Sequence, residues 1–156
     1  MGNVLVIFQA DTEHTEQMAL AIAVGAVEAQ ASIRLRRLAA PGAAEVAHKG
    51  YGKLQAPDLL WADTIVVGLE SPIPRSEELD ALLSPLSATD PDQLKGKKAW
   101  TFNPELTPSA AQTLVNSALS AAGITGHELA ILSVGVEDKL INQLKEVGRQ
   151  LAGKAT

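Results

Sequence analysis

The sequence contains no cysteine. This absence excludes a disulfide framework, catalysis by a thiol, an iron–sulfur cluster and a zinc site with thiolate ligands. Aromatic residues are scarce too: the 156 residues include two phenylalanines, two tryptophans and one tyrosine. Any redox chemistry would therefore need a bound cofactor, and few aromatic faces are available to cover one.

An excess of positive charge is also missing. The 13 lysines and arginines are outnumbered by 18 aspartates and glutamates, which gives a net charge of −5. Nucleic acids and anionic membranes are bound mainly through clustered lysine and arginine, so we expect neither as a partner. The basic run at 34–37 alternates like one face of a strand and the run at 95–98 precedes an apolar strand, so we expect both to form solvated edges.

Several catalytic motifs are absent as well. The sequence has no Gly-x-Ser-x-Gly elbow, no Gly-Lys-Ser/Thr phosphate loop and no His-Glu-x-x-His motif. Nucleophilic hydrolysis and Walker-type use of nucleoside triphosphates are therefore not expected. The first apolar run has no basic residues before it and is too short for a signal peptide or a membrane span, which predicts a cytoplasmic protein.

Short apolar runs rich in β-branched residues alternate with longer helical patterns along the chain. Strands are predicted at residues 3–8, 32–38, 63–69, 98–103 and 128–134, and helices at 14–29, 76–84, 107–122 and 137–152. This alternation predicts an α/β fold, a five-stranded parallel sheet of order 2-1-3-4-5 with helices on both faces. The chain length and the 46% hydrophobic content fit a single domain over residues 1–156.

Two segments lack a clear period. Residues 39–60 contain several glycines and prolines and are interpreted as a crossover with a poorly formed helix around 43–48. Residues 85–97 are interpreted as a surface connection before the fourth strand.

The first predicted helix is apolar nearly all round, from Met18 to Val27. A helix of this kind is usually buried on more than one side. Two interpretations stay open: the second covering surface is another subunit, which would make a homodimer, or the outer face of an alanine-rich helix is simply exposed.

The junction between the first strand and the first helix is a candidate anion site. A helix start has backbone N–H groups without intrahelical partners and the positive end of the macrodipole, so a phosphate can be bound there by backbone alone. Thr12 and Thr15 could add hydroxyl donors, or they could cap the helix with nothing bound. Asp11, Glu13 and Glu16 would oppose a dianionic phosphate by charge repulsion.

This junction resembles the phosphate loop of flavodoxins, Thr/Ser-x-Thr-Gly-x-Thr directly after the first strand. Thr12 and Thr15 match the pattern, whereas Ala10 replaces the first hydroxyl and Glu13 stands at the usual glycine. The following Glu-Gln-Met-Ala resembles the Glu-x-Met-Ala of flavodoxin-like quinone reductases. The resemblance implies a flavodoxin-like fold and FMN, with the phosphate held by both threonines and the N–H groups from Asp11 to Thr15.

Two further loops complete the resemblance. Ser71-Pro72 is similar to the Gly-Ser-Pro-x segment that lies against the flavin in quinone-reductase relatives, and the loop after the fourth strand would flank the ring from another side. Neither loop contains an aromatic residue. The implied cofactor-binding residues are Ala10, Asp11, Thr12, Glu13, His14, Thr15, Ser71, Pro72, Ile73, Asn103, Pro104 and Glu105.

The resemblance implies electron or hydride transfer, most concretely by an NAD(P)H:quinone oxidoreductase, with NAD(P)H and a quinone or a redox protein as partners. The flavin would carry the chemistry, so no catalytic protein residue is expected. The alternative is a flavin-free flavodoxin-like binding or interaction module, which Ala10, Glu13 and the shortened ring loops favour.

A third interpretation is a Mg²⁺-binding phosphoacceptor pocket, as in response-regulator receivers, built from Asp11, Glu13 and Glu70. It fits less well, because receivers end the third strand with aspartate and place a lysine after the fifth strand. Here the third strand ends in Leu69-Glu70, and Lys139 falls inside the last predicted helix.

Overall fold

The computed structural model describes residues 2–9, 13–38, 52–54, 56–69, 84–102, 110–126 and 137–151. Six parallel strands form one sheet in the order β3-β2-β1-β4-β5-β6. The strands are β1 (Asn3–Gln9), β2 (Ser32–Leu38), β3 (Gly52–Lys53), β4 (Thr64–Gly68), β5 (Lys98–Phe102) and β6 (Thr125–Gly126). The helices are α1 (Glu13–Glu28), α2 (Ala56–Trp61), α4 (Pro91–Leu94), α5 (Ala110–Ala121) and α6 (Glu137–Leu151).

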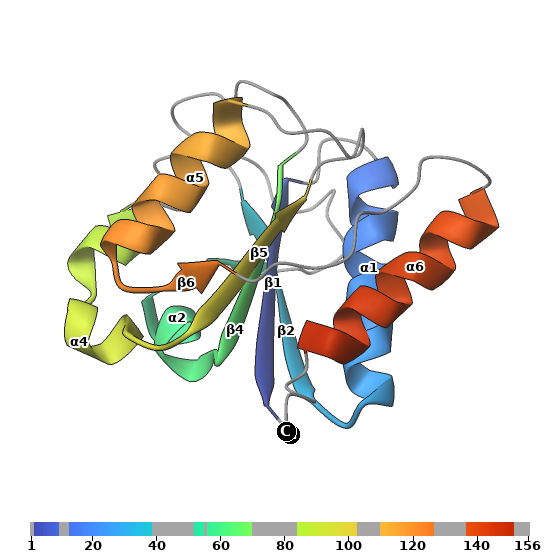
Figure 1. The fold of residues 1–156 in the computed structure, drawn as a ribbon, viewed down its shortest axis with the longest axis horizontal. Coiled ribbons are helices and arrows are strands. Elements are labelled where there is room, and N and C mark those ends of the chain that lie inside the picture. The colour runs from blue at the N-terminus through green and yellow to red at the C-terminus, as the bar shows by residue number, and fades with distance from the viewer. Residues whose placement is uncertain are drawn as a thin grey trace.

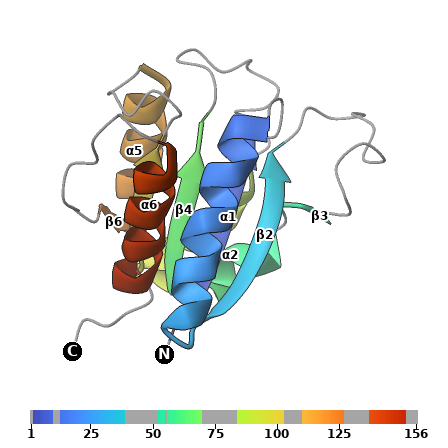
Figure 2. The same ribbon diagram turned by 90° about the vertical axis from the view of Figure 1, so that its right-hand side faces the viewer.

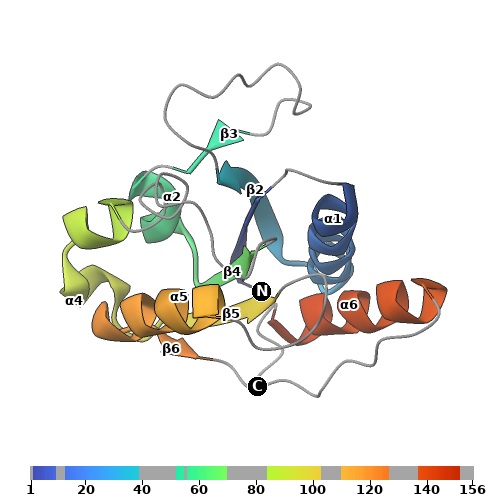
Figure 3. The ribbon, with the colours of Figure 1, turned by 90° about the horizontal axis from the view of Figure 1, so that it is seen from above.

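The helices form a layer on each face of the sheet. Helices α1 and α6 cover one face, and α2, α4 and α5 cover the other (Figures 1 and 3). Successive side chains of a strand point to opposite faces. In β1, Val4, Val6 and Phe8 therefore join one core with α1 and α6, while Leu5 and Ile7 join a second core with α2, α4 and α5.

The predicted fold class and strand order are confirmed. Four of the five predicted strands appear within one residue of their expected bounds. The fifth predicted strand, 128–134, lies outside the described residues, but β6 just before it pairs with the start of β5 at the expected edge of the sheet. None of the helices in the described ranges is long and apolar enough to cross a membrane.

Residues 39–60 were incompletely predicted. The expected helix at 43–48 lies outside the described residues. Beyond it, the two-residue strand β3 pairs with Arg36 and Arg37 of β2, so the sheet has a sixth strand that is too short for a period-two pattern. Helix α2 begins at Ala56, and Pro57 falls in its first turn, where proline is compatible with a helix.

Residues 85–97 were expected to be a surface connection, but part of this segment is helical and buried. Residues 84–88 are helical, α4 follows, and Leu86 and Leu94 are buried in the core under α2 and α5. The predicted helix at 76–84 lies outside the described residues except for its last position.

The basic run on β2 is not a solvated edge either. Arg34 Nη1 and Arg36 Nε lie 3.0 and 2.9 Å from the two carboxylate oxygens of Asp58 on α2. Asp58 is only 4% exposed, and a buried carboxylate is tolerated where it is paired in this way. The Arg34 guanidinium also lies 4.4 Å from the centre of the Trp61 ring. The arginines therefore attach α2 to the sheet.

Helix α1 is covered on its second side by α6 of the same chain (Figure 2). The two helices approach so closely that a Cβ added at Gly25 would overlap the carbonyl of Lys145, and one at Gly148 would overlap the carbonyl of Ile22. Val24 and Val27 stay 43% and 51% exposed on the outer side of α1. The burial expected of this helix is thus largely intramolecular, and the homodimer stays a prediction.

We expect Gly148→Ala to destabilise the protein. At an exposed position in a helix, changing glycine to alanine raises the free energy of unfolding by up to about 1 kcal/mol. Here the added methyl would force α1 and α6 apart, and overpacking of this kind costs about 1–3 kcal/mol. Urea denaturation measures the difference, with Ser120→Ala on the exposed side of α5 as the control for helix propensity. An unchanged or higher free energy of unfolding in Gly148→Ala would contradict the close approach.

Candidate functional site

The carboxyl ends of the three central strands form one row. The register pairs Phe8 of β1 with Gly68 of β4, and Gly68 with Phe102 of β5. Neighbouring strands lie about 4.8 Å apart, so the chain leaves these three strands within about 10 Å of one another. The described ends of β1, β4 and β5 lie at the upper edge of the sheet in Figure 1. All three predicted loops therefore start at this edge.

Most of the predicted site residues themselves lie outside the described residues. This holds for Ala10, Asp11, Thr12, Ser71, Pro72, Ile73, Asn103, Pro104 and Glu105. Glu13, His14 and Thr15 are described in their backbone alone, as the first turn of α1. The helix therefore begins one residue earlier than expected, four residues after β1 ends at Gln9. The cofactor-binding roles of these residues stay predictions.

The backbone at the start of α1 can accept an anion. The first four N–H groups of an α-helix have no intrahelical acceptor, and Glu13, His14 and Thr15 occupy that turn. The macrodipole adds positive potential at the same place. The helix start thus fits the phosphate end of FMN, while the two acidic residues of the turn, Glu13 and Glu16, would compete for that potential.

The floor beneath this edge is built from Gly68 and Phe102. A Cβ added at Gly68 would lie 2.5 Å from Cζ of Phe102, so the phenyl ring occupies the space that a side chain at position 68 would need. The N–H of Leu69 donates to the carbonyl of Phe102 at 2.9 Å, which ties the first residue after β4 to the end of β5. Sequence reasoning missed Gly68, although a glycine ending an apolar strand is a known sign of close approach.

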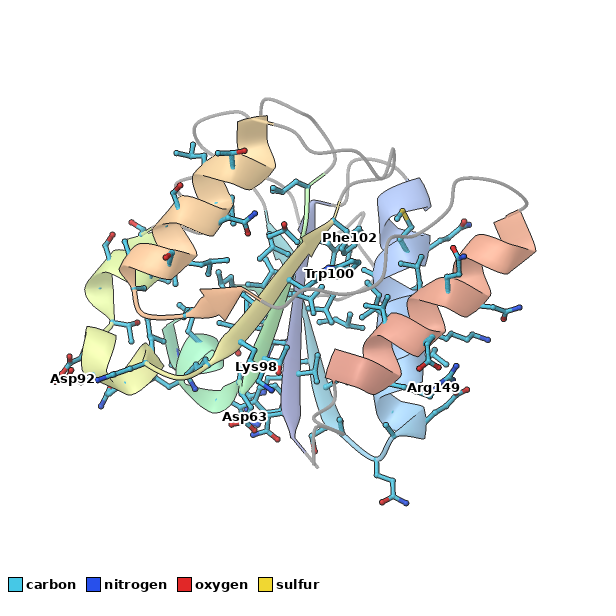
Figure 4. The ribbon with its side chains drawn as sticks, in the orientation of Figure 1. Asp63, Asp92, Lys98, Trp100, Phe102 and Arg149 are labelled. Atoms are coloured by element: carbon cyan, nitrogen blue, oxygen red, sulfur yellow. The ribbon has the colours of Figure 1, made fainter. Side chains whose placement is uncertain are left out.

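The aromatic residues near the edge belong to the core. Phe8 and Phe102 are buried, and Trp100 is half-buried and stacks on Phe102 with ring centres 5.8 Å apart (Figure 4). These rings support the site from below. Covering a flat ligand from above would therefore depend on residues of the three loops.

In the described part of the chain, no group of three histidine, aspartate or glutamate side chains is placed to hold a metal ion. The side chains of the proposed phosphoacceptor, Asp11, Glu13 and Glu70, are not among those described. Lys139 lies inside α6, as expected from the sequence, and does not directly follow a strand.

The strand order and the candidate site at the carboxyl edge are those of a doubly wound α/β protein. No family model matches the chain, and no curated protein sequence matches it. Several solved structures match the chain. The chain resembles a flavodoxin from the domain Archaea with a TM-score of 0.70 and 17% identity, covering 97% of both chains.

Two further structures agree with this result. A flavodoxin, WrbA-like protein from Agrobacterium tumefaciens has a TM-score of 0.64 and 19% identity, with 99% of this chain and 98% of that chain covered. Oxidised Flavodoxin 2 from Bacillus cereus has a TM-score of 0.66 and 19% identity, with 97% and 99% covered. The chain has a flavodoxin-like fold along nearly its whole length.

We expect Gly68→Ala to destabilise the protein by about 1–3 kcal/mol, because the new methyl would displace the Phe102 ring. Phe102→Leu removes the ring atom at which the overlap occurs. The double variant Gly68→Ala/Phe102→Leu should therefore lose less stability than the sum of the single variants, by about 1 kcal/mol or more in a double-mutant cycle. Strict additivity in chemical denaturation would show that the two residues do not interact as described.

Proposed function

We propose that this chain binds FMN at the carboxyl edge of the sheet and serves in electron or hydride transfer. The observation that carries the proposal is the junction of β1 and α1. In a flavodoxin-like fold this junction lies beside the central strand ends, and here it combines the start of a 16-residue helix with the matching Thr12 and Thr15.

Each part of the cofactor has a proposed place. Thr12, Thr15 and the N–H groups of residues 11–15 hold the phosphate. Ser71, Pro72 and Ile73 flank the ring on one side, and Asn103, Pro104 and Glu105 on the other. Bound FMN supplies the redox chemistry, while the chain orients the ring and limits the access of water. The Leu69 N–H bond to the Phe102 carbonyl and the close contact of Gly68 with Phe102 join the two strand ends from which the ring loops start.

The most concrete version of the function is a cytoplasmic NAD(P)H:quinone oxidoreductase. Two observations support it: the Glu-Gln-Met-Ala at residues 16–19 of α1, and the likeness of the fold to a flavodoxin, WrbA-like protein. A simple electron carrier that docks to a redox protein is the other version, which the likeness to flavodoxins supports equally. A homodimer is proposed as the assembly, with Val24 and Val27 as the exposed apolar residues of α1.

A flavin-free binding module is the second candidate, and one observation favours it. Helix α1 begins at Glu13, so the position at which flavodoxins usually have glycine is here an acidic residue in the first helical turn. A carboxylate in that turn stabilises the helix start without any ligand.

The first experiment is a titration of the purified apoprotein with FMN, followed by quenching of flavin fluorescence. The proposal predicts a dissociation constant in the micromolar range or below, equivalent to about −8 kcal/mol or more of binding free energy. Riboflavin should bind more weakly, because it lacks the phosphate, and inorganic phosphate should compete with FMN. No binding at high FMN concentration would refute the proposal and leave the interaction module.

The variant Glu13→Gly should bind FMN more tightly, by roughly tenfold, which is about 1.4 kcal/mol. The change removes a like charge beside the phosphate and restores the residue that flavodoxins usually have there. Glu13→Gln separates the two effects, since it removes the charge and keeps a side chain. If neither variant gains affinity, the ring loops rather than Glu13 limit binding.

A further inference from the structure

A polar hollow lies at the amino edge of the sheet, opposite the candidate cofactor site. Its volume is about 410 Å³, within the range of small-ligand sites. It lies where β1, β4 and β5 begin, and Figure 4 shows Asp63 and Lys98 there, at the far end of the sheet from Phe102. The lining residues are Gly2, Asp63, Thr64, Gln93, Lys95, Gly96, Lys97 and Lys98.

The hollow differs in charge from the rest of the protein. Its lining contains three lysines and one aspartate, a net charge of +2. Since the whole chain carries −5, all remaining residues together carry −7. A local positive potential on an acidic protein attracts anions, and the concave shape of the site strengthens that potential.

The backbone that presents these lysines is held by hydrogen bonds. Gly96 has a φ of 89° and its N–H donates to the carbonyl of Gly123 at 3.3 Å. The N–H of Lys97 donates to Leu94 at 3.2 Å, and that of Lys98 donates to the carbonyl of Asp63 at 3.1 Å. The turn between α4 and β5 therefore has one defined conformation, which lowers the entropy lost when a ligand binds.

The charged side chains of the hollow have different tasks. The ammonium group of Lys97 donates to the carbonyls of Leu60 and Ala62, where α2 ends, so Lys97 is structural. The carboxylate of Asp63 accepts from the N–H of Asn3 at 2.9 Å. Among the described residues, no hydrogen bond or ion pair uses the ammonium groups of Lys95, which is exposed, or Lys98, which is half-buried.

We propose that this hollow binds a small oxyanion with at least two negative charges, such as a diphosphate or a phosphate ester, through Lys95 and Lys98. Lysine acts as a point-charge partner for phosphate oxygens, and two such groups favour a multiply charged anion over a single carboxylate. Gly96 leaves room for it, because a Cβ added there would meet no atom within 4 Å.

The test uses inorganic pyrophosphate as the probe, titrated into the full chain at low ionic strength and followed by calorimetry. Lys95→Gln and Lys98→Gln should each weaken binding by roughly tenfold, about 1.4 kcal/mol. Asp63→Asn should strengthen binding, because it removes the opposing charge and keeps an oxygen that can accept from Asn3. Lys145→Gln on α6 is the matched control, as it changes the net charge equally outside the hollow.

Thermal melts confirm that each variant is folded, and exposed Lys95 supplies a variant with little structural effect. Three results would overturn the proposal: no heat of binding in the natural chain, equal weakening by Lys145→Gln, or loss of binding in Thr12→Ala while the lysine variants still bind. The last result would place the anion at the start of α1. The first two results do not depend on whether the chain binds FMN, whereas the third concerns the site proposed for the FMN phosphate.

Discussion

Burial of β1 on both faces is the constraint on which the rest of the structure depends. Its residues from Val4 to Phe8 are all buried, and the strand is paired on both sides, with β2 and with β4. A strand in this position needs a helical layer above and below it, and parallel neighbours need crossovers that provide those layers. The same geometry brings the ends of the central strands together at one edge, which is why a site can form there at all.

The two layers satisfy this requirement in different ways. On one face, the backbones of α1 and α6 approach each other closely at Gly25 and Gly148. Two long helices therefore fit side by side over the central strands. On the other face, α5 and the shorter α2 and α4 cover the sheet, and α2 is attached through the Asp58 carboxylate to Arg34 and Arg36. In the first layer, an exposed ion pair between Arg149 of α6 and Glu28 of α1 adds to the apolar contact. The second layer depends on the buried Asp58 carboxylate, whose pairing the apolar pattern does not encode.

Periodic patterns explain how much of the fold could be predicted. β1, β2, β4 and β5 and the long helices α1, α5 and α6 have enough residues for a clear period, and their bounds came within three residues of those observed. β3 and α4 are too short for such a pattern. Helix α2 was missed because it lies in a segment that was interpreted as irregular from its glycines and prolines, among them Pro57. The ion pair of Arg34 could not be predicted, because its partner Asp58 lies 24 residues away in the sequence.

The candidate site was predictable to a different degree. The strand order alone predicts that the three loops start at one edge, and the described ends of β1, β4 and β5 lie side by side at that edge. Gly68 and Phe102 could not be assigned from the sequence, because their relation depends on the register of β4 against β5. The cofactor-binding roles of the loop residues are predictions from their spacing and from the resemblance to flavodoxins, and the FMN titration tests them.

Charge is distributed unequally along the strand direction. The loops that leave the carboxyl edge contain Asp11, Glu70 and Glu105, while the amino edge presents Lys95 and Lys98. Acidic residues gathered at one end of a protein orient a charged partner before contact. With FMN bound as proposed, the acidic end would face a redox partner and would favour a basic docking surface. The acidic loops that weaken phosphate capture would then also select the partner, which gives a physical reason for the loop to depart from the usual flavodoxin pattern.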